Sequence, residues 1–430
     1  MKKGNINIVK DKDLCVSCGM CYTICPHNAI NMKFHKGKFI PVLNDNCVDC
    51  GKCLSYCPSY KIEINNISNF SKEDILFGRY KELYTAYLLN EDIRFDATSG
   101  GIITGIIIKL LETGAYDGSF VLPFETYKGE EVKLSLAETK NEVLKALKSK
   151  YCPVSIENVI KKISNNPESK YIIVGTPCQF YSIKKYINEN KNLISDNYLF
   201  LGLFCDSTMN FNFLNYIKDK YNIKKEISKF EYRSKKKRGW PGDLRVVFND
   251  GEELIINRNE RIKIKNYFKL NRCKYCFDKL NISADLSFGD CYINGEESNL
   301  GKTNIIVRTN IGKKVINECS EIMNLKSAKK IDIQESQFLS SKEYDFELGL
   351  KYFNIYKNSN LYINKEKDNL IKRIKDKYNL IVNNLYSIKG KNYKGYNNFL
   401  IKKCFWELIL KIIGKVRGLI KKIGGIKNHE

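Results

Sequence analysis

Two short runs of cysteine near the start of the chain constrain its fold more than any other feature. The first run is Cys15, Cys18, Cys21 and Cys25, and the second is Cys47, Cys50, Cys53 and Cys57. In each run three cysteines recur every third residue, the fourth follows after three more residues, and a proline closes the run. Such a loop presents three thiolates to an iron–sulfur cluster, and the fourth thiolate comes from the other run.

The spacing therefore predicts two 4Fe-4S clusters with crossed ligation. One cluster is assigned to Cys15, Cys18, Cys21 and Cys57, and the other to Cys47, Cys50, Cys53 and Cys25. Zinc or a disulfide framework would explain isolated Cys-x2-Cys pairs, but not two four-cysteine runs each closed by Cys-Pro. This segment resembles the bacterial two-cluster ferredoxins across residues 1–66.

Length and composition predict a folded protein of several domains. The chain has 430 residues, of which 43% are hydrophobic, enough for two or three separate cores. Residues 1–14 have no apolar segment typical of a secretory signal. Cysteines at cluster spacing then indicate a reducing cytoplasm. The longest apolar run, residues 100–111, is broken by Thr104 and Lys109 and is expected to be a buried element.

The positive charge is concentrated at the C-terminal end. The net charge is +24, and residues 351–430 hold 19 Lys/Arg against 5 Asp/Glu, a net of +14. We therefore expect no nucleic-acid partner for the core. Residues 399–423 alternate apolar and lysine positions at helical spacing. The pattern suits peripheral contact with an anionic membrane, or docking on protein, and both interpretations stay open.

We expect a multidomain protein that combines α+β and α/β architecture. The expected divisions are a ferredoxin-type domain (1–66), a linker (67–90), an α/β domain with antiparallel additions (91–340) and a basic helical tail (341–430). Apolar strands alternating with helices predict a largely parallel sheet in the third of these. The expected strands are 38–43, 61–64, 118–122, 171–174, 198–204, 244–248, 253–256 and 304–309, and residues 80–89 are a strand or a helix.

Four further cysteines follow structural signals in the larger domain. Cys178 and Cys205 each come after a predicted strand, and Cys273 and Cys276 form a Cys-x2-Cys pair. The carboxyl ends of parallel strands gather ligands at one sheet edge. From spacing alone, a third cluster and a zinc site both remain open.

The turn Thr98, Ser99, Gly100 and Gly101 opens a predicted helix. Glycines there allow close approach of a phosphate or flavin, and the helix N-terminus favours an anion. An ordinary helix N-cap with a glycine turn is the alternative.

Several motifs, taken in order, resemble the coenzyme F-420 hydrogenase/dehydrogenase beta-subunit family. They are the 97–101 turn, Lys150-Tyr151, residues 175–179, Phe204-Cys205, Arg272-Cys273-x2-Cys276, residues 284–290 and Gly301-Lys302-Thr303. The resemblance implies FAD, a third 4Fe-4S cluster on Cys178, Cys205, Cys273 and Cys276, and flavin contacts from Thr98 to Gly101 and from Lys150 and Tyr151. Cys152 and Cys291 have no role in the family pattern.

Together these features predict an iron–sulfur flavoprotein oxidoreductase of the cytoplasm. It would relay electrons between a ferredoxin or other redox partner and a small-molecule substrate, not identified by the sequence, at FAD. The alternative is a non-catalytic electron-transfer subunit of a partner enzyme. The chain has only three histidines, His27, His35 and His429, so a Ser-His-Asp site is not expected, and no catalytic residue is assigned.

Overall fold

A computed structural model describes residues 4–60, 72–123 and 129–342. The chain divides into two compact units, Met1–Phe211 with Lys225–Ile363 and Asn212–Lys224 with Asn364–Glu430. The described part of the second unit contains α10 (Asn212–Lys220). The expected strand at 61–64 and the expected helix at 399–423 lie outside the described residues. Among the described helices, none combines the length and hydrophobicity that crossing a membrane would require.

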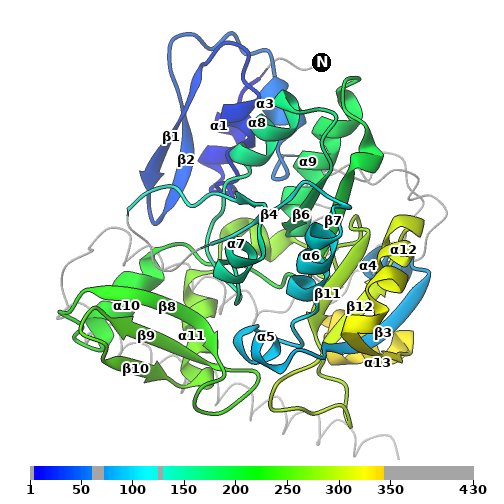
Figure 1. The fold of residues 1–430 in the computed structure, drawn as a ribbon. Helices are drawn as coiled ribbons and strands as arrows, with labels where there is room; N and C mark the ends of the chain where they lie inside the picture. The colour runs from blue at the N-terminus through cyan, green and yellow to red at the C-terminus, as the bar shows by residue number, and fades with distance from the viewer. Residues whose placement is uncertain (1–3, 61–71, 124–128, 343–430) are drawn as a thin grey trace, which may run out of the picture. The chain divides into compact units, whose positions relative to one another are not determined.

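Residues 4–60 hold both cysteine runs and a β-hairpin, drawn in blue in Figure 1. Strand β1 (Ile30–His35) pairs antiparallel with β2 (Lys38–Leu43). The sequence predicted β2 but not β1. The helices in this segment are α1 (Asn7–Asp11), α2 (Met20–Thr23) and α3 (Lys52–Ser55). Helices α2 and α3 follow Gly19 and Gly51, whose φ angles of 72° and 77° reverse the chain within each cysteine loop.

The larger part of the first unit is built on an eight-stranded mixed sheet, in the order β13-β3-β12-β11-β7-β6-β4-β5. Strands β4, β6, β7 and β11 are parallel, and the flanking pairings are antiparallel. The strands are β3 (Glu82–Leu88), β4 (Gly118–Val121), β5 (Ser135–Ala137), β6 (Tyr171–Gly175), β7 (Tyr198–Leu203), β11 (Leu286–Asp290), β12 (Thr303–Val307) and β13 (Met323–Ser327).

The mixed α/β class and the parallel centre are as predicted. Residues 80–89, which the sequence left undecided, contain β3, and β3 joins the sheet although it lies in the range expected to be a linker. Strands β5, β11 and β13 were not predicted. The helices around the sheet are α4 (Lys72–Phe77), α5 (Glu91–Asp96), α6 (Ile102–Glu112), α7 (Lys140–Lys145), α8 (Glu157–Asn165), α9 (Pro177–Glu189), α12 (Asn310–Glu318) and α13 (Lys330–Ser336).

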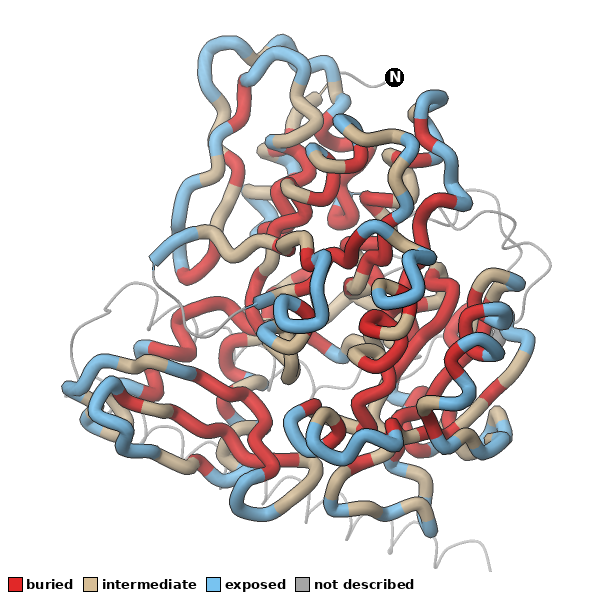
Figure 2. The backbone as a smooth tube through the Cα atoms, viewed as in Figure 1, coloured by how far each residue is buried: buried red, intermediate tan, exposed pale blue. Residues whose placement is uncertain are grey.

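Alternate residues of the central strands face opposite cores, as the period of a strand requires. Ile172 and Leu199 pack with the apolar stripe of α6 and with α12. Ile173 and Phe200 pack with α8 and α9 on the other face, in the same core as Met20 from the first cysteine loop. Figure 2 shows buried backbone running through this sheet. The first loop is therefore packed against the body of the unit.

A second, three-stranded antiparallel sheet has the order β10-β9-β8. Its strands are β8 (Ile227–Ser234), β9 (Asp243–Phe248) and β10 (Glu253–Ile256), and α11 (Arg258–Phe268) follows. The predicted hairpin between β9 and β10 is confirmed, and Gly251 adopts a φ of 85° in its turn.

Candidate functional site

The two cysteine runs form two separate thiol-lined pockets. The inner pocket is lined by Cys15, Cys18, Cys21 and Cys57. Burial raises the pKa of Cys18 well above its ordinary value, and the neighbouring thiols of Cys57 and Cys15 raise it further. Three thiols from one run thus meet one thiol from the other, as the spacing predicts. Cluster ligation by these thiols stays a prediction.

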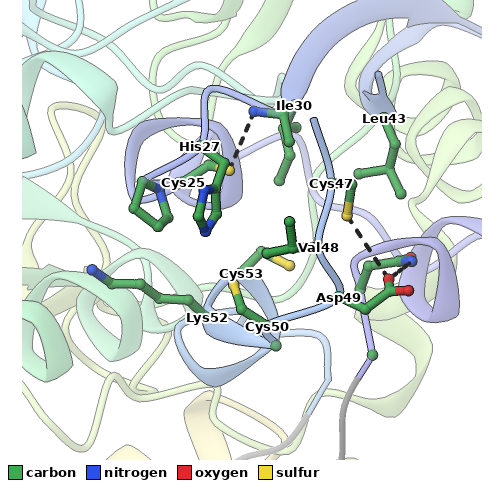
Figure 3. A pocket seen from close by; sticks show the side chains of 15 residues that line it. Cys25, His27, Ile30, Leu43, Cys47, Val48, Asp49, Cys50, Lys52 and Cys53 are labelled. Atoms are coloured by element: carbon green, nitrogen blue, oxygen red, sulfur yellow. Dashed lines mark hydrogen bonds between the residues drawn. The ribbon is translucent and has the colours of Figure 1, made fainter. Parts of the chain in front are cut away.

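The outer pocket is lined by Cys25, Cys47, Cys50 and Cys53, and Figure 3 shows these four side chains around it. Cys50 is exposed, whereas Cys53 is buried. Backbone N–H of Ala29 donates to the sulfur of Cys25 at 3.4 Å, a contact that stabilises a thiolate. The outer thiols are thus the ones that reach the protein surface.

A third group of thiols forms beside the large sheet. Cys178 is the second residue of α9, directly after β6, and Cys205 follows β7. Cys273 lies in the 3-10 helix Asn271–Tyr275, and Cys276 follows it. The pKa of Cys205 is raised well above its ordinary value, first by burial and then by the thiols of Cys273, Cys178 and Cys276. The four sulfurs therefore converge at the predicted sheet edge.

The number and kind of donors bear on which metal these groups suit. Each of the three groups gathers four thiols. A 4Fe-4S cluster takes four thiolates, each on a different iron, so the donor set of each group fits a cluster. In the described ranges, no three His, Cys, Asp or Glu side chains are placed so as to hold a single metal ion.

The inner pocket lies next to the third group. The thiol of Cys178 is among the charges that raise the pKa of Cys18. Two hydrogen bonds fix the cysteine loops to the body: Ile156 N donates to Cys18 O at 2.9 Å, and Ser182 Oγ donates to Tyr56 O at 2.9 Å. The inner thiols are thus held between the outer pocket and the third group.

The predicted turn at 98–101 is bonded within the protein. Thr98 Oγ1 accepts from Ser149 N at 2.6 Å, and Ser99 Oγ donates to Lys302 O at 2.5 Å. Gly101 is the N-cap of α6 with a φ of 81°, and a Cβ on Gly100 would lie 2.7 Å from a backbone oxygen. Close packing thus explains Gly100 and the left-handed backbone explains Gly101, in agreement with the N-cap alternative.

The structure separates Lys150 from Tyr151. Lys150 Nζ donates to the carbonyls of Ala146 and Leu147, and burial lowers its pKa to about 7. This lysine therefore caps the end of α7. Tyr151 instead lies edge-on to Tyr232, with ring centroids 5.6 Å apart.

Tyr151 belongs to a group that sequence reasoning did not assemble, here called the arginine–aromatic cluster. Its members are Tyr151, Arg233, Trp240, Arg261, Asp290 and Tyr292. The cations of Arg233, Lys265 and Arg261 hold the pKa of Tyr151 below its usual value despite burial. Asp290 lies within a motif of the predicted family, but Arg233 and Arg261 lie in no motif.

Arg261 gives this cluster an unused donor. Within the described residues, Arg261 Nε is buried and has no hydrogen-bond partner. Burial lowers its pKa, and the positive charge of Arg233 lowers it further. A buried N–H donor without a partner is costly unless a ligand or water accepts from it. Two arginines beside aromatic rings can thus hold an anionic, planar ligand.

Comparison with known protein families gives three matches along the chain. A 4Fe-4S dicluster domain matches residues 8–64. The coenzyme F420 hydrogenase/dehydrogenase beta subunit N-terminal and C-terminal models match residues 83–161 and 168–333.

Individual relatives are distant but cover most of the chain. The coenzyme F420-dependent sulfite reductase of Methanocaldococcus jannaschii is 26% identical over 77% of this chain and 50% of its own length. The chain thus spans half of that protein. A component of the F(420)H(2) dehydrogenase of Methanosarcina mazei is 24% identical over 79% of this chain and 96% of its own length. A chain of the F420-reducing [NiFe] hydrogenase complex from Methanosarcina barkeri aligns with a TM-score of 0.49 and 20% identity, over 64% of this chain and 92% of that one.

Proposed function

This chain belongs to the coenzyme F420 hydrogenase/dehydrogenase beta-subunit family and carries a 4Fe-4S dicluster domain at its N-terminus, and we propose that it is an iron–sulfur flavoprotein oxidoreductase. In this proposal it passes electrons between a redox partner protein, such as a ferredoxin, and a small-molecule substrate at FAD. The observation that carries the proposal is the convergence of twelve thiols into three neighbouring groups.

The three groups suggest an order for electron transfer. We assign one 4Fe-4S cluster to each, which would supply one-electron steps. The outer thiols, with Cys50 at the surface, would face the partner protein. The inner thiols would connect them to Cys178, Cys205, Cys273 and Cys276, because Cys18 lies close enough to Cys178 for their charges to interact.

The arginine–aromatic cluster supports a flavin site better than the 98–101 turn does. A flavin bound there would take up or release electrons one at a time on the cluster side and as a two-electron hydride on the substrate side. Arg261 would donate its unused Nε–H to the anionic part of the ligand. Arg233, oriented by Asp290, would add positive charge beside it. Trp240 and Tyr292, which pack against each other with ring centroids 4.7 Å apart, would together form one wall beside the ligand.

Coenzyme F420 is the first substrate to test, because it is named in the sulfite reductase and dehydrogenase relatives. The test of the proposed function is anaerobic purification of the full chain with iron, sulfide and flavin quantified together. We expect about twelve irons and one FAD per chain. Eight irons without flavin would support only the two clusters of the dicluster domain and would contradict the third cluster and the flavin.

A second function is a non-catalytic subunit that only transfers electrons within a complex. Two relatives have names that describe them as subunits, and this favours the second function. Reduction of F420 by the isolated chain, with reduced ferredoxin or viologen as donor, separates the two. Turnover would establish an enzyme, and reduced clusters without turnover would establish a transfer subunit.

A further inference from the structure

Arg272 connects the cysteine loops to the third thiol group. It lies in the 3-10 helix Asn271–Tyr275, directly before Cys273, and is 3% exposed. Its Nε and Nη2 both donate to the carbonyl of Pro58, at 3.2 and 3.1 Å. Pro58 directly follows Cys57 of the inner pocket. Arg272 is therefore the sequence neighbour of Cys273 in the third group, and it is bonded to the sequence neighbour of Cys57 in the inner pocket.

The outer pocket has no such link through these residues. Neither Arg272 nor Pro58 is among the described residues that line it, whereas Cys57 lines the inner pocket and Cys273 belongs to the third group.

A cation that stabilises thiolates also stabilises the added negative charge of a reduced cluster. The effect is largest where the cation is fixed and water is excluded. Arg272 meets both conditions, because it is buried and its guanidinium is held by two hydrogen bonds to one carbonyl.

We propose that Arg272 is a positioning residue shared by the inner and third centres, which holds Pro58 in place and raises the reduction potential of both centres together. This inference rests on the proposed cluster ligation. As a consequence, electrons are favoured on these two centres relative to the outer one. A change at Arg272 alters the reduction potentials of both centres together.

The test is potentiometric EPR titration of anaerobically purified full-length protein, comparing wild type with Arg272→Gln and Arg272→Lys. The glutamine variant should lower the midpoint potential of two cluster signals and leave the outer signal unchanged. The lysine variant retains the charge and should give smaller shifts. Cys25→Ser identifies the outer signal, and Arg245→Gln, which removes a buried arginine from β9, is the control.

Iron analysis separates failure of this inference from failure of the proposed function. Fewer than three clusters in the wild type would contradict the proposed function itself. With three clusters present in the wild type, equal shifts of all three signals, or no shift, would overturn the role of Arg272. Loss of iron from both variants would mean that Arg272 serves assembly instead, and would overturn it too.

Discussion

Arg233 donates two hydrogen bonds to Asp290, from Nη1 at 2.5 Å and from Nη2 at 3.0 Å. Trp240 Nε1 donates to the same carboxylate at 2.9 Å. Arg233 lies in β8 and Asp290 ends β11, so this ion pair joins the three-stranded sheet to the eight-stranded one. It fixes the geometry of the arginine–aromatic cluster.

Removing the carboxylate should therefore destabilise the protein strongly. In Asp290→Asn the Arg233 guanidinium, with a side chain 4% exposed, keeps its charge but loses its counter-charge. We expect the free energy of unfolding to fall by about 3 kcal/mol. The matched control is Asp250→Asn, which breaks a surface pair with Lys225 and should cost much less, because water screens exposed ion pairs. Equal losses in anaerobic denaturant titrations would contradict the structural role of Asp290.

Arg261 should behave in the opposite way, because its buried Nε has no partner within the described residues. Arg261→Gln removes a buried donor that has no partner in the described part of the chain, so the flavin-free protein should be no less stable than wild type. FAD affinity, measured by fluorescence quenching, should fall about tenfold or more, since a hydrogen bond to a charged group is lost. The control is Lys263→Gln, an exposed change in the same helix. Unchanged FAD affinity in Arg261→Gln would mean that FAD does not bind at the arginine–aromatic cluster.

Crossed ligation makes a specific prediction about cysteine pairs. Cys57→Ser and Cys15→Ser come from different runs but line the same pocket. Both should lose about four irons and the same EPR signal. Cys25→Ser should remove the other signal of the dicluster domain, because Cys25 lines the outer pocket. Cys319→Ala, a buried cysteine outside all three groups, should keep full iron content. Crossed ligation would be wrong if Cys57→Ser lost the signal expected to disappear in Cys25→Ser, and Cys25→Ser lost the signal expected to disappear in Cys57→Ser.

The sequence predicted the two thiol groups of residues 4–60 because cluster ligation depends on short, regular spacing, whereas the third group was implied only by the family resemblance. It also placed Cys178 and Cys205 at one sheet edge, because both follow strands that pair in parallel. It did not assemble the arginine–aromatic cluster, since Arg233 and Arg261 come from an antiparallel strand and a helix without a motif. The contact between them is set by tertiary packing. In the same way, Lys150 was expected to contact flavin but caps α7.

The burial of Lys150 should make stability depend on pH. Its pKa is about 7 in the fold and about 10.4 in an unfolded chain. Between these values the unfolded state binds more protons, so the free energy of unfolding should rise with pH, by at most about 1.4 kcal/mol per pH unit. Lys150→Met should flatten this rise in melts at pH 6, 7.5 and 9. Lys145→Met, an exposed change in α7, should not. Identical slopes in wild type and Lys150→Met would exclude this lysine as the source.

Gly19 lies where the first cysteine loop contacts Ser155 in the body of the unit. Its φ is 72°, and a Cβ there would overlap the Ser155 hydroxyl. Gly114 has a similar φ of 66° but nothing within 4 Å of an added Cβ. Gly114→Ala should therefore cost only the left-handed strain, about 1–2 kcal/mol. Gly19→Ala should cost more, because the Ser155 hydroxyl must also turn away and give up the hydrogen bond that it accepts from Glu157 N.

The double variant Gly19→Ala/Ser155→Ala separates the two costs. Removing the hydroxyl relieves the overlap but not the backbone strain, so the double variant should be more stable than the two single changes predict by addition. The measurements are the free energy of unfolding and the rate of iron release, because Gly19 follows Cys18 directly. Simple additivity, or a Gly19→Ala cost no larger than that of Gly114→Ala, would mean that the loop is not held against Ser155.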